Sequence, residues 1–174
     1  MSSDQQKNEF RADFPQRITS LLEMGRLKKQ PATQEQVVAV WQKAVQCARD
    51  AELKGLSIDG ALRLAYDAGH LAALALLSAH GLRTGSGQGH HEIAFAAASA
   101  LSDEALRDLV PNSEEIRGLR KGSMYDPVIA GPNDRDHALD WMRQTLPAIR
   151  KALIAAQSDL ATRLQPLDPD NADP

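Results

Sequence analysis

The stretch LRKGSMYDP, which runs from Leu119 to Pro127, places a guanidinium on Arg120 and a phenol on Tyr125, five residues apart. A helix should end here, because Asp126 precedes a proline and that position disfavours helical backbone angles. The segments on both sides have apolar residues at helical spacing. We therefore expect this stretch to end one helix, with the other helices of the protein packed around it.

The composition favours a helical protein. The chain has 174 residues, a length that suits one domain with a sizeable core. Aromatic residues make up only 4% of it, whereas Ala and Leu are plentiful, which favours helix over sheet. The net charge of −3 argues against a protein that coats nucleic acid through bulk charge, but it leaves room for a local basic site. We expect an all-α fold.

The sequence also bears on the compartment and on the domain boundaries. The lone Cys47 excludes an intrachain disulfide and a cysteine-based zinc site, and it fits a reducing compartment. The first ten residues lack the apolar core of a signal peptide, and no apolar run approaches membrane-spanning length. We expect a cytoplasmic protein without a membrane segment. Residues 1–14 should be flexible, 15–164 should form one helical domain, and 165–174 should be a disordered acidic tail.

Capping signals mark the helices of the first half. A short helix should follow Pro15, and residues 28–32 should form a linker. Thr33 and Gln36 have the capping-box pattern, so a second helix should open at Gln34. Its apolar residues recur at helical spacing: Val37, Trp41, Ala44, Val45, Ala48 and Ala51.

A third helix should be the central one, because it is apolar on most of its sides. We expect Asp59 to cap it and Gly81 to stop it after His80.

One strip of this third helix differs from the rest. Arg63, Asp67 and His70 fall at positions i, i+4 and i+7, with Tyr66 beside them. Two interpretations stay open. The strip could be an exposed face that carries an Arg–Asp pair, or it could be a polar seam that faces a cleft or a partner subunit.

Residues 82–89 (LRTGSGQG) are expected to form a flexible loop because they contain three glycines. Their G-x-G-x-G spacing resembles a phosphate loop only superficially, since no strand pattern precedes it. His90, His91 and Glu92 then open a fourth helix. They could bind a metal, although the HExxH pattern is not completed, or the histidines could meet an anion at the helix N-terminus. Our expectation is a site without metal or cofactor.

The second half should contain two short helices and one long one. Ser102 and Ser113 occupy positions typical of N-caps for the short helices, and Asn133 or Asp134 should cap the long one. Trp141 lies beside the apolar stripe of the long helix and could mark an interface. The stripe, at spacings of three and four residues, would close a bundle or pair with another subunit: Leu139, Met142, Leu146, Ile149, Leu153, Ala156 and Leu160.

The order of four features resembles a known family. These features are AYDA at 65–68, a glycine loop ending in GHH at 89–91, the LR-x4-YDP stretch at 119–127 and LPAI at 146–149. Together they resemble the HEPN superfamily, the higher eukaryote and prokaryote nucleotide-binding domains. The likeness covers roughly Pro31 to Leu164. It is greatest to small stand-alone bacterial members from mobile, defence or toxin–antitoxin gene neighbourhoods.

The resemblance implies a fold and a site. The fold would be an up-and-down bundle of four to five helices with short extra helices, usually dimeric. In active members an Arg-x4-6-His motif from each subunit forms a metal-independent ribonuclease site across the dimer. The motif's Arg falls on Arg120, and the polar residue that often follows it becomes Lys121. Its His would fall on Tyr125. A cognate antitoxin or nucleotidyltransferase protein is a further implied partner.

Tyr125 in the histidine position bears directly on the chemistry. Metal-independent RNA cleavage needs groups that exchange protons near neutral pH, and imidazole suits this role because its pKa is near 6.5. A phenol with a pKa near 10 is mainly a hydrogen-bond donor, and a guanidinium does not release its proton. Arg120 and Lys121 can still hold a phosphate. If His90 and His91 fold over Arg120, they could supply the missing imidazole.

Three functions follow from these residues. The first is a HEPN-like module that binds RNA or nucleotide, with a degenerate nuclease motif. It would use Arg120, Lys121 and Tyr125, the histidines His90 and His91, and the strip residues Tyr66, Asp67 and His70. The second is an active ribonuclease whose catalytic residues would be Arg120, Tyr125 and His91. The third is a protein-interaction module that uses the apolar stripe of the last helix.

Overall fold

The computed structural model describes residues 14–125 and 129–167, and it is mostly helical, which confirms the predicted all-α fold. The elements, in chain order, are α2 (Gln16–Glu23), β1 (Leu27–Lys29), α3 (Gln34–Ala51), α4 (Ile58–Ala79), β2 (Leu82–Thr84), α5 (His90–Ala100), α6 (Glu104–Tyr125), α7 (Pro132–Ala156) and the 3-10 helix η1 (Ser158–Thr162).

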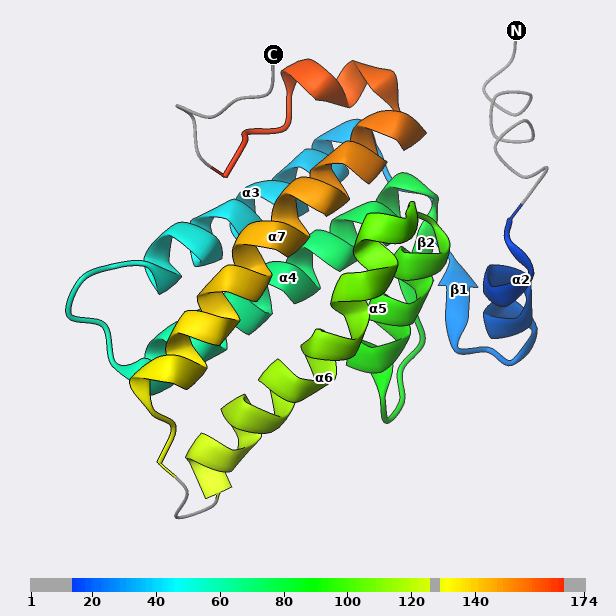
Figure 1. The fold of residues 1–174 in the computed structure, drawn as a ribbon. Coiled ribbons are helices and arrows are strands. Elements are labelled where there is room, and N and C mark those ends of the chain that lie inside the picture. The colour runs from blue at the N-terminus through cyan, green and yellow to red at the C-terminus, as the bar shows by residue number, and fades with distance from the viewer. Residues whose placement is uncertain (1–13, 126–128, 168–174) are drawn as a thin grey trace, which may run out of the picture.

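Helix α4 lies at the centre, in contact with α3, α5, α6 and α7 (Figure 1). Its buried residues cover a broad face of the helix, and Arg63, Asp67 and His70 lie on the remaining strip, where Arg63 is exposed and the other two are half-buried. Ser57, rather than the predicted Asp59, caps it, and the Ser57 hydroxyl accepts a hydrogen bond from the Gly60 N–H at 3.1 Å. The prediction was wrong because the chain is already helical at Asp59. The helix ends at Ala79, and Gly81 has a φ of +67°, in agreement with the predicted stop.

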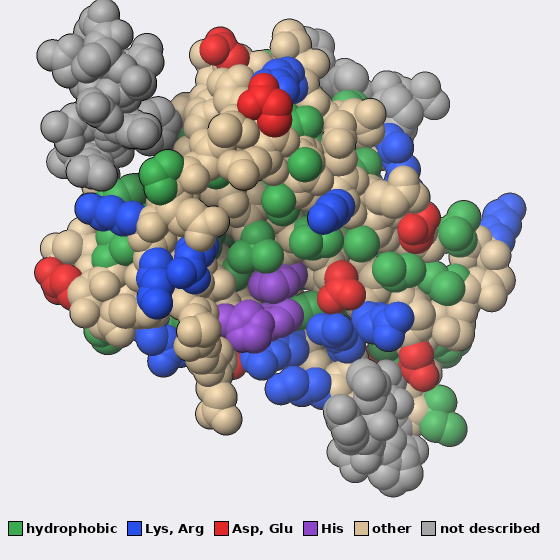
Figure 2. All heavy atoms as spheres, turned by 180° about the vertical axis from the view of Figure 1, so that it is seen from behind, with side chains coloured by type: hydrophobic (Ala, Val, Ile, Leu, Met, Phe, Trp, Pro, Cys, Tyr) green, Lys and Arg blue, Asp and Glu red, His purple; other side chains and the backbone are tan. Residues whose placement is uncertain are grey.

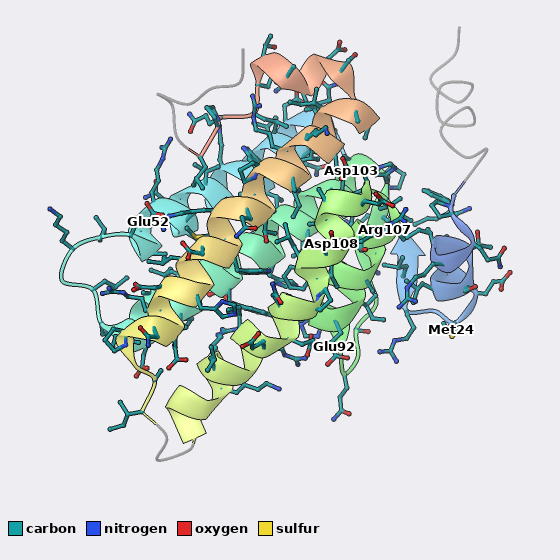
Figure 3. All side chains as sticks on the ribbon, viewed as in Figure 1. Met24, Glu52, Glu92, Asp103, Arg107 and Asp108 are labelled. Carbon is teal, nitrogen blue, oxygen red and sulfur yellow. The ribbon has the colours of Figure 1, made fainter. Side chains whose placement is uncertain are left out.

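Helix α3 begins as predicted. Thr33 Oγ1 accepts from the Gln36 N–H at 3.2 Å, and Gln36 Oε1 accepts from the Thr33 N–H at 2.9 Å, so the capping box is complete. All six predicted apolar positions of this helix are buried. At its other end, Glu52 forms an ion pair with Arg143 of α7 at 2.6 Å (Figure 3).

Two segments predicted as a linker and a flexible loop form a small antiparallel sheet instead. β1 pairs with β2, and Leu27 lies opposite Thr84. Leu27 and Leu82 are buried in the core, and the burial of these two side chains outweighs the local preference of the glycines and polar residues that follow. Figure 1 shows β1 and α2 at one side of the bundle, next to the end of α5.

Helix α6 replaces the two short helices that Ser102 and Ser113 predicted. Asp103 rather than Ser102 accepts a hydrogen bond from the first turn, at Ala105 N. Ser113 is buried inside the helix, and its hydroxyl donates to the carbonyl oxygen of Val110 at 2.6 Å. The helix continues through Pro111 and ends at Tyr125, as the sequence before Pro127 predicted.

The continuity of α6 has a packing cause. Leu106 and Ile116 are both buried, on either side of the proline. Most helical stability in proteins comes from tertiary packing, and here it outweighs the loss of one backbone hydrogen bond at Pro111.

Helix α7 begins at Pro132 rather than after a cap at Asn133 or Asp134. Gly131 is the N-cap residue, and the Asp134 carboxylate accepts its N–H at 2.7 Å from inside the first turn. The prediction failed because Pro132 is well suited to the first helical position, which moves the boundary back. The helix runs through Pro147 to Ala156.

Apart from the half-buried Ala156, the members of the apolar stripe are buried within the protein's own core, where α7 packs against α4. Of the two predicted uses of this stripe, the structure shows the closing of the bundle, and an interaction with another protein through this surface stays a prediction. Leu160, its last predicted member, lies in η1. Trp141, predicted to mark an interface, is buried against Gly69 of α4, and its Nε1–H donates to the Leu109 carbonyl at 3.0 Å.

The chain ends and the surface complete the outline. Residues 165–167 were predicted as part of a disordered tail, but the carbonyl of Gln165 accepts the Trp41 Nε1–H at 2.8 Å. Residues 1–13 and 168–174, for which flexibility and disorder were predicted, lie outside the described residues. None of the helices in the described part of the chain combines the length and the apolarity that a bilayer crossing requires.

Candidate anion-binding site

Three histidines from two helices meet at one place on the protein. His70 of α4 stacks on His91 of α5, with ring centroids 3.9 Å apart and planes 13° apart. His90 lies next to His91, at 4.4 Å between centroids. His70, from the polar strip of α4, and the two histidines at the start of α5 therefore form one group. We call His70, His90 and His91 the histidine cluster. The sequence left this proximity undecided.

Tyr66 supports the cluster from beneath. Its hydroxyl and Nδ1 of His91 are hydrogen-bonded at 3.2 Å, and its ring is near-parallel to those of His70 and His91. Burial raises the pKa of Tyr66 to about 12, so the phenol stays protonated. Its side chain is fully buried, so the predicted part of Tyr66 in binding would be an indirect one, through His91. Its role in the site is to hold His91.

Helix α6 brings cations to the same place. The guanidinium of Arg120 lies 5.3 Å from the centre of the Tyr66 ring and forms an ion pair with Asp67 at 3.4 Å. Arg63, the predicted partner of Asp67, is exposed. Lys121 is exposed beside Arg120, and its charge acts on His91.

Arg117 is a member of the site that the sequence analysis missed. It forms an ion pair with Glu92 of α5 at 2.6 Å and another with Glu114 at 3.5 Å. Figure 3 shows Glu92 where α5 lies beside α6. A signal existed in the sequence, since Arg117 lies three residues before Arg120 and so falls on the same face of a helix.

The electrostatics of the cluster keep two of its imidazoles neutral. Burial, together with the neighbouring histidines and arginines, lowers the pKa of His70 to about 3. Burial and the charges of His90, Arg117, Arg120 and Lys121 lower the pKa of His91 to about 4. Asp67 differs, because burial raises its pKa although Arg120 opposes the change.

The chain before α5 is held in a defined conformation. Gly89, the N-cap residue of α5, has a φ of +79°, a conformation that glycine adopts without strain. The Arg26 guanidinium donates to the carbonyl of Gln88 at 3.0 Å, and the Gly85 N–H donates to the Arg26 carbonyl at 2.8 Å. Residue 26 therefore links the N-terminal part of the chain to the segment that delivers the histidines.

The histidines and cations together form a surface suited to an anion. On the face shown in Figure 2, the purple histidine side chains lie among blue Lys and Arg side chains. The first-turn N–H groups of α5 point along the helix axis toward its N-terminus, where an anion is stabilised by the helix dipole. In the described part of the chain, no group of three His, Cys, Asp or Glu side chains could hold a metal ion.

The predicted site residues thus fall into three groups. His70, His90, His91, Asp67, Arg120 and Lys121 are brought together, and Tyr66 lies beneath them. The side chain of Tyr125 lies outside the described residues, so its predicted role stays a prediction. Comparison with family models, with curated proteins and with solved structures finds no match to this chain.

Proposed function

We propose that the protein binds the phosphate groups of RNA or of a nucleotide at the histidine cluster and the adjoining cations of α6. One observation carries this proposal: His91, at the start of α5, and Arg120 of α6 both lie against Tyr66, and the charges of Arg120 and Lys121 act on His91 although they are far from it in sequence. Guanidinium and ammonium groups form charge-assisted hydrogen bonds with phosphate oxygens. A neutral imidazole can donate one hydrogen bond as well.

Arg120 is the residue whose removal tests this function. We expect Arg120→Ala to weaken binding of a fluorescent oligouridylate, measured by anisotropy, by about tenfold or more, as for the loss of one charged hydrogen bond worth roughly 1.5–3 kcal/mol. The dependence of log K on log salt should also become shallower by about 0.7, the value for one phosphate contact on a single strand.

Arg107→Ala is the matched control for this experiment. Arg107 is an exposed arginine of the same helix, labelled in Figure 3, and thirteen residues of helix separate it from Arg120, or about 20 Å. It should leave affinity and salt dependence close to those of the wild type. If Arg120→Ala binds as tightly as the control, the proposed site is wrong.

Cleavage of RNA is the second candidate function, and the contact of His91 with Tyr66, next to Arg120, favours it. An imidazole within reach of a bound phosphate could move a proton during 2′-OH attack. Incubating a mixed RNA pool with the protein in EDTA tests this directly. Wild-type cleavage that is lost in Arg120→Ala and in a His90→Ala/His91→Ala variant would support it. Cleavage unchanged in both variants would indicate a contaminant.

The resemblance to the HEPN superfamily extends the proposal to the protein's setting. We propose a cytoplasmic homodimer that belongs to a bacterial defence or toxin–antitoxin type system, with an antitoxin or nucleotidyltransferase protein as its partner. Light scattering of the purified protein tests the dimer, and co-purification with the products of neighbouring genes tests the partner. A monomer at micromolar concentration with no co-purifying protein would contradict both.

A further inference from the structure

The histidine cluster contains three imidazoles in contact but no ion pair between any of them and a carboxylate among the described residues. The nearby carboxylates are already bound to arginines, since Asp67 faces Arg120 and Glu92 faces Arg117. A proton added to one imidazole therefore has cations around it and no anion beside it. Like charges in contact disfavour each other's charged form.

The surroundings of the histidine cluster can be described element by element. His90 contacts the rings of His70 from α4 and His91 from α5. Around the cluster as a whole, α4 contributes Asp67, α5 contributes Glu92, and α6 contributes Arg117, Arg120 and Lys121, whose charges act on His91. The segment before α5 contributes the backbone carbonyl of Gly87. In the same segment, the Arg26 guanidinium donates a hydrogen bond to the carbonyl of Gln88. Apart from Glu92, which is engaged with Arg117, and Asp67, which is engaged with Arg120, these groups are neutral or positive.

One hydrogen bond fixes the tautomer of His90. Its Nδ1 lies 3.1 Å from the carbonyl oxygen of Gly87. A carbonyl oxygen can only accept, so Nδ1 carries the proton and donates it. In the neutral ring, Nε2 is then a bare acceptor. A phosphate oxygen is also an acceptor, so it cannot form a hydrogen bond with Nε2 until that nitrogen is protonated.

We propose that a phosphodiester binding at the histidine cluster recruits one proton to Nε2 of His90, so that the protein binds RNA more tightly as the pH falls. The proton comes from the solvent, the nitrogen lone pair forms the new N–H bond, and this N–H donates to the phosphate. The phosphate supplies the negative charge that the cluster lacks. By thermodynamic linkage, a ligand that raises proton affinity must itself bind better when the proton is present. This inference rests on the proposed function.

Oligouridylate is the probe for this test, because neither its phosphodiesters nor its uracil rings change protonation between pH 5 and pH 8. The affinity of the wild-type protein should rise as the pH falls, by at most about tenfold per pH unit for one linked proton. At a single pH, calorimetric titrations in two buffers of different ionisation enthalpy should give different heats, in the direction of proton uptake.

Two variants locate the proton. His90→Asn keeps an amide that can donate to the Gly87 carbonyl but cannot take up a proton, so its binding should be independent of pH and of the buffer. His137→Asn is the matched control. His137 lies on α7, where it faces Glu115 at 3.3 Å, and its replacement should leave the proton uptake of the wild type unchanged.

The outcomes separate this inference from the function it rests on. Binding without proton uptake in the wild type, or undiminished uptake in His90→Asn, would overturn the proton-linked mechanism and leave RNA binding in place. Absence of oligouridylate binding at every pH would overturn both.

Discussion

Gly69 shows how a single residue sets the distance between two helices. It faces Trp141, and a methyl group at Gly69 would overlap the six-membered ring of that indole. The contact also supports the site, because Trp141 stacks on Tyr66, which holds His91. A glycine in the middle of a helix therefore has a packing function here.

Gly69→Ala should destabilise the protein. Overpacking a core typically costs about 1–3 kcal/mol, and the rigid indole has little room to move. Gly118→Ala is the control, because nothing lies within 4 Å of a methyl group at that helical position. It should raise stability by roughly 0.5–1 kcal/mol, the ordinary gain of alanine over glycine in a helix. Urea denaturation of both variants measures the difference, and equal stability of the two would contradict this account.

Single residues also show what the sequence could tell about the site. The i, i+4, i+7 spacing predicted that Arg63, Asp67 and His70 share a face of α4, but it could not say which helix covers that face. The ion pair that formed joins Asp67 to Arg120, a residue of another helix, rather than to Arg63. Spacing within one helix carries no information about contacts between helices, so the convergence itself was not predictable.

At the level of elements, the β1–β2 sheet positions the start of α5. Arg26, just before β1, binds the Gln88 carbonyl through its side chain and the Gly85 N–H through its own carbonyl. Both strands fall in segments that were predicted to be irregular, a linker and a loop with three glycines, and each strand is only three residues long. Their pairing depends on residues distant in sequence, and local propensity does not report it.

Arg26→Ala should loosen the segment between β2 and α5. Removing the guanidinium leaves the Gln88 carbonyl without this donor, so amide hydrogen exchange over residues 85–91 should become faster, while α3 and α7 keep their protection. Arg83→Ala serves as the control, since that side chain bonds only to the carbonyl of its neighbour Thr84 in the described structure. Equal exchange rates in the two variants would show that Arg26 does not position the histidines.

Helix α6 illustrates a second limit of predicting helix boundaries from sequence. Ser102, Pro111 and Ser113 are local stop and start signals, and a serine at a cap and a serine inside a helix look alike in sequence. Where a capping signal agreed with the packing, as at Thr33, the prediction was confirmed. Where burial of Leu106 and Ile116 opposed the signal, burial decided the structure.

For the whole molecule, the all-α fold and the central place of α4 were predictable, because both follow from composition and from the pattern of apolar residues. The surface that the apolar stripe of α7 packs against was not predictable. The pattern of apolar residues looks the same in sequence whether the stripe packs against its own chain or against another. The structure shows that it meets α4.

The stability of the whole fold should depend on pH through His70. Its pKa is about 3 in the folded protein, against about 6.5 in an unfolded chain. Below pH 6.5 the unfolded state thus binds a proton that the folded state does not bind until about pH 3. The free energy of unfolding should fall as the pH decreases across this window, by up to about 1.4 kcal/mol per pH unit. Above pH 6.5 both states are neutral at this residue, and the effect vanishes.

His70→Phe tests this, because it keeps an aromatic ring in the cluster but removes the titration. Urea denaturation at pH 7 and at pH 5 should show a smaller loss of stability at the lower pH in this variant than in the wild type. Equal losses in both proteins would mean that His70 is not held neutral by the fold.

The pairing of β1 with β2 also affects the order in which a nascent chain can take shape. Thr84 follows its partner Leu27 by 57 residues, so at translation rates of about 5–20 residues per second β1 is made roughly 3–11 seconds before β2 is complete. Helix α4, which lies between them in sequence, is synthesised in that interval. On the ribosome the hydrophobic centre is therefore available before the two strands can join. The histidines of α5 and the arginines of α6 follow, and α7, whose Trp141 stacks on Tyr66 beneath the histidines, is made last, so the site is complete only when the last helix packs.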